Sequence, residues 1–226
     1  MEDKVPLKAG FLLDTGAPPP MITIRPTYGA KRLMDLTLVL LTIPITVPLI
    51  AVLWVFVRQD GATGFFGHSR IGRDGQMFNC WKLRSMVEGA EAKLHIHLAE
   101  NPKAAAEWAS HRKLTHDPRI TRLGQLLRKT RLDELPQLWN VLIGEMSLVG
   151  PRPITRSELG KYGVYRNVYL AQRPGLTGVW QVLGDTSDPY SDRVAMDVTY
   201  AARRGVFYDI GLMLCTVGVM LVRVGK

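Results

Sequence analysis

An uncharged apolar run at residues 36–57 constrains the fold of this chain more than any other part of its sequence. As a straight helix these residues would reach roughly 33 Å, which is enough to cross a bilayer. Pro44 and Pro48 interrupt the run, and each removes a backbone hydrogen bond and bends a helix. Basic residues lie on both sides, namely Arg25, Lys31, Arg32, Arg58, Arg70 and Arg73. Since positive charge marks the cytoplasmic side, we expect a re-entrant helix with both ends there, and a spanning helix is the alternative.

The charge of the chain predicts an anionic partner. Its 226 residues can bury one sizeable core, and they carry a formal net charge of +9 with a pI near 9.8. Nucleic acid, a membrane surface or a phosphorylated substrate would each fit this charge. The sequence contains no nucleic-acid-binding motif, so no nucleic-acid partner is expected, and the apolar run favours membrane lipids. Cys80 and Cys215 are too few for a disulfide framework and are expected to be ordinary reduced thiols.

An acidic pair, Asp133-Glu134, precedes a stretch with helical periodicity. The apolar residues recur at intervals of three and four and predict one buried helix face, formed by Leu135, Leu138, Trp139 and Leu142. Pro136 suits the first turn of such a helix. The pair would then lie at the helix N-terminus, where the helix dipole favours negative charge.

Cations surround this pair in the sequence. Upstream lie Arg119, Arg122, Arg128, Lys129 and Arg131, and downstream Arg152 stands on the stiff segment Gly150–Pro153. Two carboxylates among fixed cations suit a magnesium-bound diphosphate substrate. The alternative is simpler: acidic residues at a helix start are commonly caps, and cations before a helix are commonly solvated.

Several blocks resemble one known family in the same order along the chain. The matching blocks are Arg70-Ile71-Gly72, Lys82–Met86, Asp117–Gly124, Asp133–Leu138, Ser147–Pro153 and Arg173–Gly178. Together they resemble the bacterial sugar transferases, the monotopic phosphoglycosyl transferases that act on polyprenyl phosphate. The resemblance covers about residues 30–224 and is strongest to the short enzymes that start exopolysaccharide synthesis, galactose-1-phosphate transferases included.

The resemblance implies a reaction and a role for five residues. A sugar-1-phosphate would pass from a UDP-sugar, foremost UDP-galactose or UDP-glucose, to undecaprenyl phosphate, with release of UMP. Asp133 would be the nucleophile that forms an aspartyl–phosphosugar intermediate. Glu134, with Asp133, would hold Mg²⁺, while Lys82, Arg152 and Arg173 would contact the phosphates.

The expected fold class is mixed α/β and mainly helical. The resemblance implies a small, compact cytosolic catalytic domain on a proline-broken re-entrant membrane helix, with interfacial amphipathic helices. We expect a flexible leader at 1–26, the re-entrant helix at 27–58 and the catalytic domain at 59–226. Residues 87–115 are typical of two helices broken at Asn101-Pro102. The apolar run 210–222 is too short to span a bilayer and is expected to lie in the interface or to pack beside the re-entrant helix.

The resemblance, together with the basic flanks of the apolar run, implies the bacterial inner membrane as the location, and we expect the catalytic domain on the cytoplasmic face. UDP-sugar, undecaprenyl phosphate and membrane lipids are its expected partners, and a homodimer is a further arrangement to test. Two other functions stay open from the residues alone. One is a glycosyltransferase that releases UDP, and the other is a non-catalytic membrane-anchored protein whose basic face binds anionic lipid.

Overall fold

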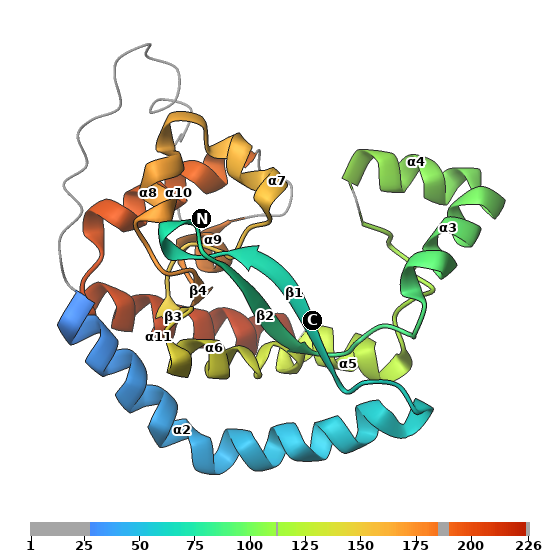
Figure 1. The fold of residues 1–226 in the computed structure, drawn as a ribbon, viewed down its shortest axis with the longest axis horizontal. Helices are drawn as coiled ribbons and strands as arrows, with labels where there is room; N and C mark the ends of the chain where they lie inside the picture. The colour runs from blue at the N-terminus through green and yellow to red at the C-terminus, as the bar shows by residue number, and fades with distance from the viewer. Residues whose placement is uncertain (1–27, 112, 185–189, 225–226) are drawn as a thin grey trace, which may run out of the picture. The chain divides into compact units, whose positions relative to one another are not determined.

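The computed structural model describes residues 28–111, 113–184 and 190–224. The predicted leader, residues 1–26, lies outside the described residues. The described chain is mainly helical with small sheets, as predicted (Figure 1). Its helices are α2 (Tyr28–Val57), α3 (Ala90–Glu100), α4 (Pro102–His111), α5 (Arg122–Thr130), α6 (Gln137–Ile143), α7 (Arg156–Leu159), α8 (Arg166–Leu170), α9 (Val179–Leu183), α10 (Tyr190–Arg203) and α11 (Val206–Val224). Its strands are β1 (Phe65–Ile71), β2 (Met77–Leu83), β3 (Ser147–Val149) and β4 (Gly175–Thr177).

The chain packs as two compact units. The first unit comprises the described residues of Met1–Pro44, Gly67–Cys80 and Gln137–Lys226, and the second comprises Ile45–Phe66 and Trp81–Pro136. The β1–β2 pair and helix α2 each contribute residues to both units. These are units of packing, and the expected division into leader, membrane helix and catalytic domain stays a prediction.

A short parallel strand pair forms the centre of the first unit. Strand β3 pairs with β4 so that Ser147 lies opposite Gly175 and Val149 opposite Thr177. Gly150 and Gly175 allow this approach, since a Cβ on Gly175 would lie 2.1 Å from the Gly150 nitrogen. The pair packs against α11 through a buried cluster that includes Val149 and Leu212 (Figure 1).

A tyrosine-rich cluster fills the other side of the first unit. Tyr162 and Tyr169 are buried with their ring centroids 5.1 Å apart. The Tyr162 hydroxyl donates to Asp197 Oδ2 at 2.7 Å. Burial raises the pKa of Asp197 to about 6, although Tyr162, Arg193 and Arg152 favour its charged form. Asp197 therefore lies within the packing of this cluster.

The second unit contains the predicted helical pair. Helices α3 and α4 meet at Asn101, whose side-chain oxygen accepts from the Ala104 N–H at 3.2 Å, so the expected break is confirmed (Figure 1). The core of this unit joins Val57, Leu83 and Leu127, and so connects the end of α2, strand β2 and helix α5.

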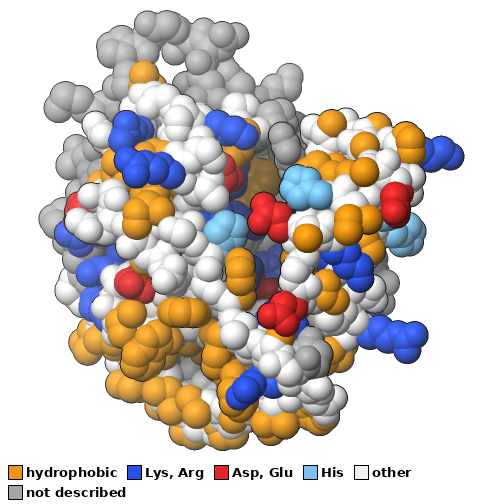
Figure 2. Space-filling view, turned by 45° about the vertical axis from the view of Figure 1, so that its right-hand side comes forward, with side chains coloured by type: hydrophobic (Ala, Val, Ile, Leu, Met, Phe, Trp, Pro, Cys, Tyr) orange, Lys and Arg blue, Asp and Glu red, His pale blue; other side chains and the backbone are white. Residues whose placement is uncertain are grey.

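Helix α2 is the one helix in the described residues that is long and apolar enough to cross a membrane. The α-helix is continuous from Tyr28 to Val57. Pro44 and Pro48 lie inside it, and both are exposed. Large apolar side chains on it face outward, and Figure 2 shows hydrophobic side chains gathered along the lower edge of the molecule, where α2 lies in Figure 1. Thr42 Oγ1 donates to the Val39 carbonyl at 2.8 Å, shortly before Pro44 in the chain.

Candidate active site

The acidic pair lies in a tight turn between two helices. Arg131, at φ 58° in the left-handed region, ends α5, and its N–H bonds the Arg128 carbonyl. Asp133 and Glu134 then occupy a 3-10 turn, Leu132–Glu134, and α6 begins only after Pro136. The prediction that the pair and Pro136 belong to the first turn of one helix is thus wrong in detail. Proline has no N–H to continue the turn, so the α-helix starts behind it.

The buried face of α6 agrees with the predicted one only in part: Leu138 and Leu142 are half-buried and pack against a core cluster. Gln137, Asn140 and Val141 are its buried residues, whereas Trp139 is 58% exposed. The Asn140 side chain donates to the Asn79 carbonyl at 2.8 Å, so a polar bond decides which face points inward. Apolar periodicity alone cannot separate a face that packs in a core from a face left exposed.

Lys82 binds both members of the acidic pair. Its Nζ lies 2.6 Å from Glu134 Oε1 and 3.9 Å from Asp133 Oδ2. Asp133 is only 6% exposed. The structure thus brings together three of the five predicted site residues, which come from segments some fifty positions apart in the sequence.

The surroundings of Asp133 shift its acidity. Burial, the largest influence, raises the pKa of the Asp133 carboxyl above its ordinary value of 3.8; Glu134 adds to the rise, and Lys82 and Arg128 oppose it. Burial therefore outweighs the groups that favour the charged form of this carboxyl. Burial beside a fixed cation, with a shifted pKa, is typical of a functional carboxylate.

Helix α5 is held next to this site through Ser85. The Arg128 Nε donates to Ser85 Oγ at 2.8 Å, and the Thr121 N–H donates to the Ser85 carbonyl. Gly124 permits this contact, because a Cβ there would lie 2.0 Å from the Ser85 oxygen. Two of the motif blocks, Lys82–Met86 and Asp117–Gly124, thus meet through backbone contacts, and Arg128 becomes part of the electrostatic surroundings of Asp133.

Arg84 fastens the strand that carries Lys82. Its guanidinium donates to the carbonyls of Val57, Thr63 and Met86 at 2.6, 2.6 and 3.1 Å. Arg84 therefore joins the C-terminal end of α2 to the end of β2. This role was not predicted, because nothing in the motif distinguishes a structural arginine from a substrate-binding one.

Arg152 and Arg173 belong to the first unit, and their placement relative to the acidic pair stays a prediction. The loops that carry them are held together, since the Gly175 N–H donates to the Pro151 carbonyl at 2.8 Å. Arg152 is exposed, and Arg173 is half-buried with its Nε donating to the Gly144 carbonyl at 2.7 Å. The motif blocks Ser147–Pro153 and Arg173–Gly178 are thus neighbours in the structure.

Comparison with known proteins decides the family. The family model described as "Bacterial sugar transferase" matches residues 27–223. The chain belongs to the bacterial sugar transferase family. It is 46% identical over 195 residues to a UDP-galactose-lipid carrier transferase of Erwinia amylovora, and 45% identical over 195 residues to an undecaprenyl-phosphate galactose phosphotransferase of Salmonella typhimurium. Each match covers 86% of this chain but 41% of the relative, so the chain spans about two fifths of the length of these relatives.

A relative of similar length also matches this chain. The exopolysaccharide production protein ExoY of Sinorhizobium fredii is 42% identical over 196 residues, which cover 86% of this chain and 87% of the relative. The family resemblance drawn from the motif blocks is therefore confirmed across nearly the whole described chain.

The acidic pair offers oxygen ligands of the kind that suit a magnesium ion. No group of three or more His, Cys, Asp or Glu side chains that could hold a metal occurs among the described residues. Mg²⁺ needs no such cage, because it commonly binds one or two carboxylates and completes its shell with water and substrate phosphates. The adjacent Asp133 and Glu134 would supply those carboxylates.

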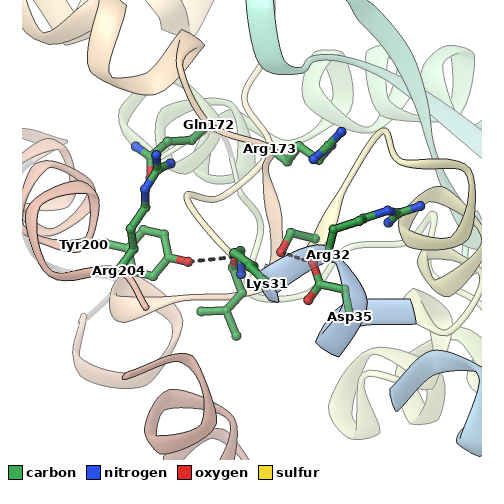
Figure 3. Close-up of a pocket in the computed structure, with 9 residues that line it drawn as sticks. Lys31, Arg32, Asp35, Gln172, Arg173, Tyr200 and Arg204 are labelled. Carbon is green, nitrogen blue, oxygen red and sulfur yellow. Dashed lines mark hydrogen bonds between the residues drawn. The ribbon is translucent and has the colours of Figure 1, made fainter. Parts of the chain in front are cut away.

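Sequence reasoning missed a polar cluster in the first turns of α2. Lys31 forms an ion pair with the buried Asp209 at 2.5 Å, and the Arg32 guanidinium donates to the carbonyls of Val141 and Leu142 at the end of α6. The buried Asp35 accepts from Ser147 Oγ at 2.7 Å. Lys31, Arg32, Asp35 and Ser147 line a small pocket (Figure 3). Lys31 and Arg32 were predicted only as basic flanks of a membrane helix, and Asp35 gave no signal.

Proposed function

We propose that this sugar transferase moves a sugar-1-phosphate from a UDP-sugar to undecaprenyl phosphate and releases UMP. The observation that carries the proposal is the buried Asp133, placed with Glu134 around the single ammonium of Lys82. The relatives support the substrate classes, since their names refer to a UDP-galactose-lipid carrier and to undecaprenyl-phosphate galactose. UDP-galactose and UDP-glucose are the donors to test first. UDP-glucose is included because a relative in Escherichia coli is named a UDP-glucose:undecaprenyl-phosphate glucose-1-phosphate transferase.

The proposed reaction has two displacements at one phosphorus atom. An Asp133 carboxylate oxygen attacks the β-phosphorus of the UDP-sugar, and the bond from that phosphorus to the bridging oxygen breaks, so UMP leaves. A phosphate oxygen of undecaprenyl phosphate then attacks the aspartyl–phosphosugar, and the bond to Asp133 breaks. Burial suits Asp133 to this role, because a raised pKa gives a more basic carboxylate while Lys82 keeps the charged form accessible.

Fixed cations would offset the repulsion between this carboxylate and the diphosphate. Lys82 stands beside Asp133 for that purpose, and Arg152 and Arg173 would bind the phosphoryl oxygens in the fork geometry of a guanidinium. Mg²⁺ bound by Glu134 and Asp133 would supply further charge neutralisation at the diphosphate. The transferring group would then meet positive charge wherever negative charge develops.

Helix α2 would hold the enzyme in the bacterial inner membrane. We propose that it re-enters at Pro44 and Pro48, with both ends and the catalytic residues on the cytoplasmic side. Exposed apolar residues on α11 suit a helix that lies in the interface; they are Phe207, Ile210, Leu214 and Val217. This arrangement would place a soluble nucleotide sugar and a lipid phosphate at the same depth.

The test is a turnover assay in nanodiscs with undecaprenyl phosphate, Mg²⁺ and a panel of radioactive UDP-sugars, scoring UMP against UDP. We expect UMP with at least one sugar, loss of turnover in EDTA, and recovery on adding Mg²⁺. Asp133→Asn should lower turnover by on the order of 10³-fold or more and abolish sugar-dependent labelling of the protein. Asp74→Asn is the matched control, because Asp74 is exposed and asparagine tolerates its left-handed backbone.

Two outcomes would contradict the proposal. Release of UDP in place of UMP would identify a glycosyltransferase that leaves the phosphate behind. Equal behaviour of Asp133→Asn and the parent protein, with binding to anionic lipid but no nucleotide product, would identify a non-catalytic lipid-binding protein.

A further inference from the structure

A second pocket lies in the first unit, where the turn between β1 and β2 meets helices α7 and α8 (Figure 1). Its volume is about 280 Å³, close to the lower end of the roughly 300–1,000 Å³ range of pockets that bind small molecules. This size suits a ligand with one ring system and one small charged group. None of the residues that line the pocket is among those proposed to act in the transfer reaction.

Hydrogen bonds hold the wall of this pocket in place. The Ile71 N–H donates to the Ile154 carbonyl at 2.9 Å. The buried Tyr169 hydroxyl donates to the Ile71 carbonyl at 2.8 Å and accepts from the Ile154 N–H at 3.2 Å. These bonds join the end of β1 to the segment before α7 and to α8. The pocket is therefore formed before any ligand enters it.

The inner lining of the pocket is apolar. Ile71 and Leu159 are 3% and 6% exposed, and Leu170 is half-buried. Met77, at the start of β2, also lines the pocket and is half exposed. A thioether makes favourable contacts with aromatic rings, and aliphatic side chains give the hydroxyls of a sugar no hydrogen-bond partner. The lining therefore favours a flat ring with apolar faces.

Two arginines give the pocket its charge. Arg156 lies on α7 and Arg166 at the start of α8, and both are exposed. Neither forms an ion pair or a side-chain hydrogen bond with any residue that the structure describes. None of the described residues that line the pocket carries a carboxylate. Since a guanidinium matches the geometry of phosphate oxygens, the pair suits a phosphate group.

The acidic residues nearest in the sequence are occupied by other cations. Glu158 pairs with Arg70 at 3.4 Å through one carboxylate oxygen and with Arg193 at 3.6 Å through the other. Asp74 pairs with its neighbour Arg73 at 3.0 Å. The two arginines of the pocket are thus left to attract an anion from outside.

Gly160 leaves the pocket open at the end of α7. Its φ of −60° and ψ of −29° suit any residue, and a Cβ there would meet no atom within 4 Å. Neither the backbone nor the packing therefore requires glycine at this position. A larger side chain should be tolerated by the fold, and it offers a way to fill the pocket.

We infer that this pocket binds a nucleoside monophosphate. The base lies against Ile71, Leu159 and Met77, and the phosphate accepts hydrogen bonds from Arg156 and Arg166. The ribose lies between them, with its hydroxyls toward solvent. The bound nucleotide joins the β1–β2 turn to α7 and α8, and it takes no part in the proposed transfer.

The experiment is isothermal titration calorimetry of the full chain in neutral detergent, with AMP as the probe because the proposed donor contains no adenine. We expect binding with a Kd below about 1 mM. Adenosine lacks the phosphate and ribose 5-phosphate lacks the base, so each should bind at least about tenfold more weakly. Ribose 5-phosphate or inorganic phosphate binding as tightly as AMP would overturn the nucleotide as the ligand.

Variants assign the binding to this pocket. Arg156→Gln and Arg166→Gln should each weaken AMP binding about tenfold, through the loss of a charged hydrogen bond. Arg203→Gln is the matched control, because Arg203 is exposed, does not line the pocket and changes the net charge equally. Gly160→Leu should weaken AMP binding while it unfolds at the same denaturant concentration as the parent.

Asp133→Asn separates this site from catalysis. It should bind AMP as the parent does, so loss of turnover and loss of nucleotide binding are independent results. Absence of AMP binding at about 1 mM would overturn the inference. Equal AMP affinity of the parent and both arginine variants would also overturn it.

Discussion

Lys82 Nζ lies 2.6 Å from Glu134 Oε1 but 3.9 Å from Asp133 Oδ2. One ammonium group thus makes a close ion pair with the more exposed carboxylate and a looser one with the buried carboxylate. The arrangement leaves Asp133 within the field of a cation without a short bond to it. Lys82 therefore favours the ionised form of Asp133 against the burial that raises its pKa, and it does so without a short bond to the attacking oxygen.

The first prediction concerns the pH dependence of Lys82→Met. Burial raises the pKa of Asp133 and Lys82 opposes the rise, so removing Lys82 should raise this pKa further. Because Asp133 must be ionised to attack, the acidic limb of kcat/KM should move to higher pH. UMP release measured from pH 5 to 9 checks this. Lys82→Arg keeps the positive charge, so its acidic limb should stay near that of the parent protein. An acidic limb that does not move in Lys82→Met would show that Lys82 does not influence the pKa of Asp133.

The second prediction concerns Asp35. This buried carboxylate accepts from Ser147 Oγ at 2.7 Å and from the Leu148 N–H at 3.3 Å. Asp35→Ala leaves both donors without this acceptor and should lower the free energy of unfolding by about 1–3 kcal/mol. Chemical unfolding in detergent measures the change. Glu100→Ala removes an exposed carboxylate and should have little effect; equal stability of both variants would show that Asp35 does not hold β3 to α2.

The third prediction concerns Asp197. Its pKa is raised to about 6 from an ordinary value of 3.8, chiefly because it is buried. Between these values the unfolded chain releases the proton while the folded protein keeps it. The free energy of unfolding should therefore fall by up to about 3 kcal/mol as the pH rises from 4 to 6, and this loss should level off above pH 6.

Asp197→Asn isolates this contribution, because asparagine does not titrate. The difference in unfolding free energy between parent and variant should shift in favour of the variant as the pH rises through that window. Unfolding curves at pH 4, 5, 6 and 7 give the difference directly. A difference that stays constant across the four values would mean that Asp197 does not change its protonation there.

The fourth prediction distinguishes a re-entrant α2 from a spanning one. Single cysteines at Ala30→Cys and Gln59→Cys, both at exposed positions near the ends of α2, report on its two ends. The background carries Cys215→Ser, because Cys215 is exposed whereas Cys80 is buried. In right-side-out membrane vesicles neither cysteine should react with an impermeant maleimide, and in inverted vesicles both should react. Labelling of one end from each side would establish a spanning helix.

Local sequence patterns predicted helices and helix breaks correctly where these depend on residues that are adjacent in the chain. The break at Asn101 and the long apolar helix follow from proline chemistry and hydropathy. The same reasoning failed at α6, where Trp139 is exposed and Asn140 is buried. The Asn140 bond to Asn79 joins positions 61 apart, and no periodicity within the helix encodes it.

The sequence by itself determined the family, the long apolar helix and the identity of the acidic pair, because each can be recognised from residues that are adjacent in the chain. Only the tertiary structure decided that Lys82 pairs with Glu134, that burial makes Asp133 less acidic, and that Lys31, Arg32 and Asp35 line a small pocket. The physical reason is that desolvation and charge pairing depend on distances in space. Those distances arise only when segments far apart in the chain are packed against one another.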